Sequence, residues 1–149
     1  MASGTITGST GNQYIDAKIE WSSTANASTN KSTVTAALYY KRNNTGFVTS
    51  GTGTFYITIN GTRTSATKTL NITESAWVKA VEATVAVSHN SDGSKAITIS
   101  ATGSISGTSL SSTSVSGTAT LDPMPRASTI DSLSCATKYF NGKMTYKYT

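Results

Sequence analysis

The sequence predicts an all-β protein, an antiparallel β-sandwich or jelly-roll-like fold, because composition and residue pattern agree. Threonine, isoleucine and valine make up 45 of the 149 residues, and these β-branched side chains suit a half-buried pleated sheet better than a helix. Hydrophobic and polar residues alternate in seven or eight short segments, which is the period of a strand with one buried face. Turns rich in Gly, Asn and Ser separate these segments, as is typical of sandwiches.

Each predicted strand has an inward set of alternating residues, and the residues between them point outward. In the first clear strand, Asp16, Lys18 and Glu20 occupy the outer face, whereas Trp21 is expected to be buried. Tyr39 lies on the outer face of the next strand. The inward sets are Ile15, Ala17, Ile19 and Trp21; Val34, Ala36, Leu38 and Tyr40; Phe55, Ile57 and Ile59; Val81, Ala83, Val85 and Val87; Ile97, Ile99 and Ala101; and Val115, Gly117, Ala119 and Leu121.

The pair Asn60-Gly61 predicts a hairpin that joins residues 55–59 to a returning strand at residues 62–70. Both central residues of a type I′ turn need a positive φ, and Asn-Gly is the preferred pair for that geometry. Residues 73–79 are the only segment that could be helical, and one or two turns would be the limit.

A polar run from His89 to Ser94 predicts a second turn between strands. Asp92 and Gly93 are typical turn residues, and Asp92 is expected to accept hydrogen bonds from the turn backbone. Asn90, Asp92 and Ser94 have the spacing that opens a calcium loop, but the later bidentate glutamate is absent. His89 lacks the partners of a catalytic base, so we expect its replacement by alanine to alter the stability of the turn at most.

The sequence predicts one complete domain followed by the start of another. Both prolines lie in residues 122–129, which we expect to be a semi-rigid linker after a β-sandwich domain of residues 1–121. Residues 130–149 are too few for a domain and would form the first hairpin of a second β domain. Residues 103–117 contain three glycines among serines and threonines, which predicts a thinly packed edge or a face that a neighbouring subunit covers.

The composition excludes several kinds of chemistry. A single cysteine, Cys135, excludes an internal disulfide, and one cysteine with one histidine excludes a Cys/His zinc site. The seven carboxylates show no pair placed as a glycosidase requires, and no glycine-rich loop opens a helix to bind a nucleotide. No apolar run is long enough for a membrane span or a signal peptide. We therefore expect a soluble protein that is not an enzyme, does not insert into a membrane, and needs no cofactor or metal.

The distribution of charge does not favour nucleic-acid binding. The chain has 12 basic and seven acidic side chains, a formal net charge of +5, but they are spread evenly rather than gathered in a basic stripe. Residues 138–148 interleave lysine with aromatic residues, which is more typical of a solvent-facing strand than of a base-stacking platform. We expect no nucleic-acid partner.

Three aromatic residues are candidates for sugar binding. A pyranose ring stacks on an aromatic face while its hydroxyl groups need short polar partners. Tyr39 and Tyr56 alternate outward on their predicted strands, and Trp77 lies in the loop or short helix of residues 73–79. Outward tyrosines are also common without a function, and a tryptophan in a sandwich often fills the core, so both interpretations stay open here.

Several segments together resemble a family of virion structural proteins from tailed phages of Gram-positive bacteria, streptococcal siphophages in particular. These are the strand ending in Ile-Glu-Trp-Ser at residues 19–22, the His-Asn-Ser-Asp-Gly-Ser-Lys turn at residues 89–95, and the Pro-Arg-Ala-Ser sequence at residues 125–128. The resemblance extends to about residue 130. Met124 between the prolines is a small departure from the family pattern.

The resemblance implies a tail-tip or fibre-like component of the virion, assembled in the host cytoplasm with other tail proteins. It also implies adhesion to the host surface, with cell-wall saccharide as a possible ligand, and favours a homo-oligomer, possibly a trimer. A phage appendage must do without disulfides while it assembles in a reducing cytoplasm, which agrees with the composition. The alternatives are a carbohydrate-binding module of a larger enzyme and a domain of a bacterial surface adhesin.

Overall fold

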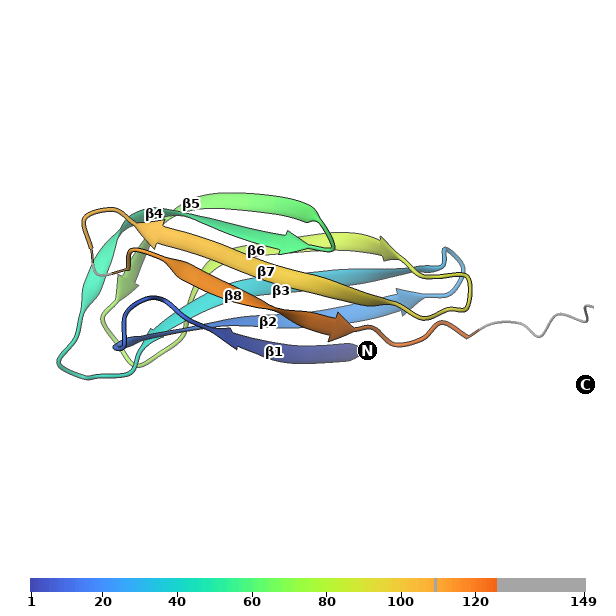
Figure 1. Cartoon of the computed structure of the whole chain (residues 1–149), viewed down its shortest axis with the longest axis horizontal. Coiled ribbons are helices and arrows are strands. Elements are labelled where there is room, and N and C mark those ends of the chain that lie inside the picture. Colours follow the sequence, from blue (N-terminus) through green and yellow to red (C-terminus); the bar gives the residue numbers. More distant parts are fainter. Residues whose placement is uncertain (109, 126–149) are drawn as a thin grey trace, which may run out of the picture.

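The structure is a computed structural model that describes residues 1–108 and 110–125, and it confirms the all-β prediction. The strands run along the long axis of the molecule and pack as two layers (Figure 1). In order along the chain they are β1 (Ala2–Gly8), β2 (Ile15–Asn26), β3 (Lys31–Arg42), β4 (Thr49–Ile59), β5 (Thr62–Ile72), β6 (Val78–Ser88), β7 (Ala96–Ile105) and β8 (Thr113–Thr120). Residues 73–77 form a bend before β6, so the helical option for this segment is wrong.

Two four-stranded antiparallel sheets make up the sandwich. The first sheet has the strand order β1-β2-β3-β6, and the second has the order β5-β4-β7-β8. The chain crosses from one sheet to the other after β3, after β5 and after β6. Because hydrophobic residues alternate along each strand, each sheet turns one face to the other sheet and one face to solvent. Both outer faces are therefore available for binding.

The core lies between the sheets and contains most of the inward sets expected from alternation, while Val85 and Trp21 are partly buried and pack against it. Tyr40 and Phe55 are its largest fully buried side chains, and their ring centroids lie 5.7 Å apart. The Tyr40 hydroxyl shares a 2.6 Å hydrogen bond with Thr113 Oγ1, so the polar end of this buried ring has a partner. Burial raises the pKa of Tyr40 to about 12, because it disfavours the charged phenolate.

Trp21 departs from the prediction that it is buried. It lies on the inward face of β2 but is only partly buried at the margin of the core. Its partner across the edge strand β1 is Gly4, which has no side chain to cover the indole ring. A Cβ atom at Gly4 would lie 2.8 Å from Trp21 Nε1, so the indole uses the space that the glycine leaves.

Strands β4 and β5 form the predicted hairpin through Asn60-Gly61. The φ angles of these residues are 49° and 86°, as a type I′ turn requires. The pairing is longer than the alternation of hydrophobic residues indicated, because it continues from Ile59 opposite Thr62 to Thr49 opposite Ile72.

The glycine-containing stretch at residues 103–117 includes part of β8, which is an edge strand as one interpretation of the sequence predicted, but Gly103 and Gly117 are closely packed. A Cβ atom at Gly103 in β7 would lie 2.4 Å from Phe55 Cδ1, and one at Gly117 in β8 would lie 2.9 Å from Ile6 Cγ2. These two glycines therefore make room for large side chains of other strands, as glycine in a strand often does, whereas a Cβ atom at Gly107 would meet nothing within 4 Å. In the described residues, this side of the core is covered without a neighbouring subunit.

The predicted polar turn between β6 and β7 is confirmed, and it follows a buried histidine, His89. Asp92 Oδ1 accepts a 2.9 Å hydrogen bond from the Ser94 backbone N–H. Only 7% of His89 is exposed. Its Nδ1 lies 2.8 Å from the Gly93 carbonyl oxygen, and its Nε2 lies 2.7 Å from Ser32 Oγ. The imidazole therefore ties the turn to the start of β3.

The first residues after β8 are held against the sandwich. The backbone N–H of Leu121 donates to the Lys95 carbonyl at 2.9 Å, and that of Met124 donates to the Gly93 carbonyl at 2.8 Å. Both Leu121 and Met124 are buried. The predicted linker thus begins as a docked segment. Residues 126–149, with the rest of that linker and the predicted start of a second domain, lie outside the described residues.

Candidate binding surface on the outer face of the first sheet

The structure places the three candidate aromatic residues on two opposite faces. Tyr39 projects outward from β3, Trp77 immediately precedes β6, and both lie on the outer face of the first sheet. Tyr56 projects outward from β4 in the second sheet. The core of the sandwich separates Tyr56 from the other two, so the three cannot form one site. Lys18 of β2 links Tyr39 to Trp77, because its ammonium lies 5.8 Å and 4.2 Å from their ring centroids.

Strand register determines which residues surround this aromatic pair. Two neighbouring rows of outward side chains cross β2, β3 and β6. One row consists of Lys18, Tyr39 and Lys79, and the next consists of Glu20, Ala37 and Glu82. The register of β3 with β6 shifts at Leu38 and Tyr39, where β6 has one extra residue, Ala80. A bulge of this kind changes the direction in which the flanking side chains point. It lets Lys79 and Glu82 face the same side although they are three residues apart.

Three lysine ammonium groups lie against the two rings. Besides Lys18, Lys41 approaches the Trp77 centroid to 4.9 Å, and Lys79 approaches the Tyr39 centroid to 5.8 Å. These distances are within the range of cation–π attraction. Only 15% of the Lys18 side chain is exposed, whereas Trp77 is 37% exposed. The lysines therefore position the rings, and part of the indole remains open to a ligand.

The small side chain of Ala37 leaves a hollow beside Tyr39. Its volume is about 250 Å³, and it is lined by Glu20, Trp21, Ser22, Thr35, Ala37, Tyr39 and Glu82. The hollow is an open depression in the face of the sheet. Glu20 on one side forms an ion pair with Lys18, so the carboxylates and cations of this surface are in direct contact. The hollow thus offers hydroxyl donors and acceptors, two carboxylate acceptors and one aromatic side wall.

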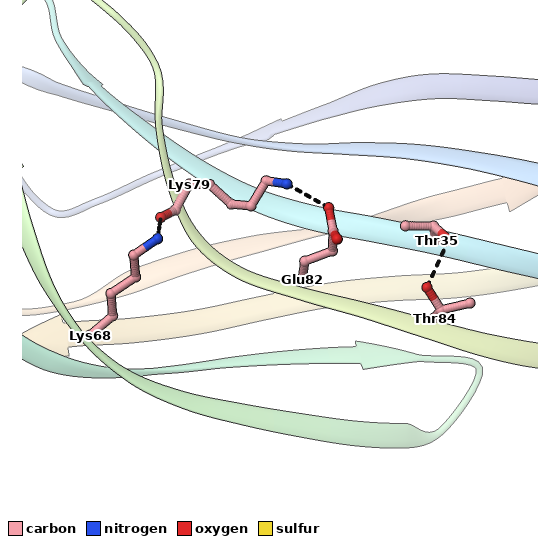
Figure 2. A network of polar contacts seen from close by, with 5 residues as sticks. All are labelled: Thr35, Lys68, Lys79, Glu82 and Thr84. Carbon is pink, nitrogen blue, oxygen red and sulfur yellow. Dashed lines mark hydrogen bonds and ion pairs between the residues drawn. The ribbon is translucent and has the colours of Figure 1, made fainter.

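A network of polar contacts fixes the β6 side of the hollow (Figure 2). Lys79 Nζ lies 2.6 Å from Glu82 Oε2, and the Thr35 and Thr84 hydroxyls are 2.9 Å apart. Lys68 reaches across from β5 and donates to the Lys79 carbonyl oxygen at 2.7 Å. Hydrogen bonding to Glu82 raises the pKa of Lys79, because this contact favours the charged ammonium. The network therefore presents a fixed pair of opposite charges beside the hollow.

Tyr56 has a different environment on the second sheet. The Arg63 guanidinium lies 3.8 Å from the Tyr56 ring centroid and stacks on that ring. Hollows of about 260 Å³ lie on either side of Tyr56 and are lined mainly by serine and threonine. This surface offers one aromatic ring whose face the guanidinium contacts, and no carboxylate lines either hollow. It is the poorer of the two candidates for sugar recognition.

Sequence reasoning identified Tyr39 and Trp77 but not the charged residues that surround them. The alternation places Lys18 and Glu20 on an outer face, where a solvated role was the simpler interpretation. Their alignment with Tyr39 depends on the turn between Asn26 and Lys31, which sets the register of β2 with β3. Locating that turn from its Asn and Ser residues would have predicted this row. Nothing in the sequence pattern signals the bulge in β6.

A comparison with protein families gives the origin of the chain. Residues 9–142 match the family described as "Siphovirus protein of unknown function (DUF859)". The chain belongs to this siphovirus family. The match confirms the phage origin that the sequence resemblance implied. No curated protein and no solved structure matches the chain.

Within residues 1–108 and 110–125, no group of three His, Cys, Asp or Glu side chains could hold a metal ion. The same residues contain no helix that is long and apolar enough to cross a membrane.

Proposed function

We propose that this siphovirus protein is a non-enzymatic structural module of the virion, in the tail, a fibre or the baseplate, and that it contributes to adhesion to host cell-wall polysaccharide. Membership of the siphovirus family supports the phage setting. The observation that carries the adhesive role is a hollow lined by Tyr39, hydroxyl groups and carboxylates, on the same face as Trp77, to which Lys18 links Tyr39.

This arrangement suits a sugar for two physical reasons. The apolar C–H face of a pyranose gains contact with an aromatic ring, and Tyr39, which lines the hollow, offers such a ring. The sugar hydroxyls that face the sheet lose water and need partners, which Glu20, Glu82 and Thr35 supply. Because the hollow is open and shallow, each contact is expected to be weak. A site of this kind is useful to an appendage that carries several copies.

Assembly into a homo-oligomer, with a trimer as one form, remains part of the proposal. The packing of Gly103 and Gly117 against other strands removes the earlier structural reason for it. The remaining support is avidity, because linked copies raise the effective concentration of weak sites without any new contact. Symmetric homo-oligomers are also the usual assembly of repeated subunits. Other tail proteins would be the further partners.

The same surface would also serve a carbohydrate-binding module of a larger enzyme, and this is the leading alternative. A bacterial surface adhesin is the second alternative, and the siphovirus family match argues against it. Labelled-antibody microscopy of purified particles separates these functions. The proposal expects antibody at the tail or its tip, whereas antibody absent from the particle would contradict it.

Binding to polysaccharide purified from the host cell wall tests the adhesive role. Tyr39→Ala is expected to weaken binding roughly five- to tenfold, the loss of about one aromatic contact. Tyr56→Ala is a matched control, because Tyr56 is also an outward tyrosine in contact with a cation but lies on the opposite sheet. Wild-type affinity in the Tyr39 variant, or loss only in the Tyr56 variant, would overturn the assignment of the surface.

A further inference from the structure

We propose that the hollow beside Tyr39 binds an uncharged pyranose of the host glycan, which donates hydroxyl hydrogen bonds to Glu20 on one side and to Glu82 on the other. The proposal rests on the function proposed above and names the chemical class of its ligand. It follows from the place of the two carboxylates in the hollow and from the way in which neighbouring lysines neutralise them.

Two carboxylates flank the floor of the hollow. Glu20 of β2 and Glu82 of β6 lie opposite Ala37 of β3 on its two sides, and all three residues line the hollow. Ala37 is only 3% exposed, so its methyl group forms the floor. The backbones of β2 and β6 are about 10 Å apart, which is two strand spacings. The two carboxylates can therefore contact opposite sides of one sugar ring that lies over Ala37.

Each of these carboxylates is neutralised by a lysine of the neighbouring row. Lys18 forms an ion pair with Glu20 Oε1, and Lys79 Nζ lies 2.6 Å from Glu82 Oε2. About half of each glutamate side chain is exposed, at 47% and 46%, so a ligand can reach both. An ionised carboxylate has about four acceptor sites. Both glutamates therefore keep acceptor sites for hydroxyl groups while they are paired with their lysines.

An anionic sugar gains no net attraction from this surface. Its charge would lie next to two carboxylates, and like charges repel, while the ammonium groups that could offset this repulsion are already paired with the same carboxylates. Lys41 adds no excess positive charge, because it lies opposite Asp16 in the pairing of β2 with β3. A hydroxyl group, in contrast, donates a charge-assisted hydrogen bond to a carboxylate. The hollow thus favours a sugar that carries hydroxyl groups and no charge.

The aromatic residues hold part of this arrangement in place before a ligand arrives. The Lys18 ammonium lies 5.8 Å and 4.2 Å from the ring centroids of Tyr39 and Trp77. The same ammonium pairs with Glu20, and only 15% of the Lys18 side chain is exposed. A side chain that is already fixed in its binding position loses less entropy when the ligand binds. The rings therefore favour sugar binding by holding Lys18, which in turn holds the Glu20 carboxylate.

Glu82→Gln tests the charge of the ligand by the direction of its effect. The amide keeps the shape of the side chain, but it is a weaker acceptor and it releases Lys79 from its ion pair. For an uncharged ligand, the affinity of the 149-residue chain for polysaccharide from the host cell wall should fall roughly fivefold, the difference between a charged and a neutral acceptor. An anionic ligand would bind this variant more tightly, because a repelling charge is removed and an ammonium is released.

Glu74→Gln is the matched control for this variant. Glu74 is exposed in the bend before β6 and lies outside the residues that line the hollow. The same loss of one negative charge should therefore leave the affinity for the polysaccharide unchanged. Calorimetry measures both variants beside the wild-type chain, and urea denaturation checks that each of them is folded.

Ala37→Leu tests whether the ligand lies in the hollow. The larger side chain would fill the space over the floor between Glu20 and Glu82, so affinity should fall roughly tenfold, the effect of about one steric clash. Ala86→Leu is the matched control, because Ala86 is exposed on the same face, two rows away and opposite Thr33. It adds the same apolar side chain outside the hollow and should leave affinity unchanged.

Removing the charges of the polysaccharide gives an independent measurement. Polysaccharide whose phosphate groups have been removed and whose carboxylates have been reduced to alcohols should bind within about twofold of the native form. Added salt should have little effect on either affinity, because binding of an uncharged ring forms no exposed charge pair for salt to screen.

The possible outcomes separate this inference from the function on which it rests. Unchanged or tighter binding by Glu82→Gln, loss of binding by the uncharged polysaccharide, or wild-type affinity in Ala37→Leu would overturn the inference and leave the proposed adhesion intact. Equal loss in Glu82→Gln and Glu74→Gln would show a general effect of charge and also overturn it. Failure of the native polysaccharide to bind the wild-type chain would overturn both proposals.

Discussion

Replacing Gly103 by alanine tests how the core of this sandwich is packed. The new Cβ atom would lie 2.4 Å from Phe55 Cδ1 and 3.0 Å from the Tyr40 hydroxyl oxygen. Both rings are fully buried, so neither can turn into solvent to relieve the contact. Forcing one extra methyl into a packed core costs typically 1–3 kcal/mol, and alanine recovers up to about 1 kcal/mol because it restricts the unfolded chain. The expected net loss in the free energy of unfolding is about 1–2 kcal/mol.

Urea denaturation followed by tryptophan fluorescence measures this loss. Ser104→Ala is a suitable control, because Ser104 is the next residue of β7 and points to solvent; its effect should stay within about 0.5 kcal/mol. Phe55→Leu should relieve the clash in part, so the double variant should lose less stability than the sum of the two single variants. Wild-type stability of Gly103→Ala would refute the packing described here and restore the interpretation of a thinly packed face.

Three further predictions concern other parts of the fold. His89→Ala should lower the free energy of unfolding by about 1–3 kcal/mol, because Ser32 and the Gly93 carbonyl lose a buried partner; the affinity for glycan, measured alongside, should not change. Gly61→Val should destabilise the hairpin by about 1 kcal/mol or more in thermal unfolding, since φ at this position is 86°. Stability should fall as the pH rises from 10 to about 12, because the unfolded chain ionises Tyr40 at its ordinary pKa while burial raises its pKa to about 12 in the fold. Tyr40→Phe, compared by urea denaturation across that pH range, should abolish this part of the pH dependence.

The fold could be predicted well because alternation and turn chemistry are local properties of a sequence. The inward set from Val34 to Tyr40 is buried as expected, and Asn60-Gly61 forms the expected turn. Predictions that depended on pairing between distant strands were weaker. Trp21 is only partly buried because its partner is Gly4, a pairing that alternation cannot reveal. Gly103 suggested a thinly packed region because the sequence alone does not show that Phe55 packs against it.

The candidate surface could be predicted only in part for the same reason. Residue type indicated Tyr39 and Trp77 as aromatic groups able to stack on a sugar. The sequence could not show that Tyr56 lies on the other sheet, since this depends on the crossing of the chain after β3. Lys18 lies against both Tyr39 and Trp77 because of the register in which β2, β3 and β6 pair. That register depends on turns and bulges more than on composition.

Nuclear magnetic resonance of the isotope-labelled chain, titrated with polysaccharide from the host cell wall, tests the central claim most directly. The account predicts that amide shifts will move in the outward rows of β2, β3 and β6 around Tyr39 and Ala37, and in the side-chain indole N–H of Trp77. Amides around Tyr56 and Arg63 on the second sheet should stay in place. Shifts confined to the second sheet, or no shifts at saturating polysaccharide, would contradict the claim that the outer face of the first sheet binds the host surface.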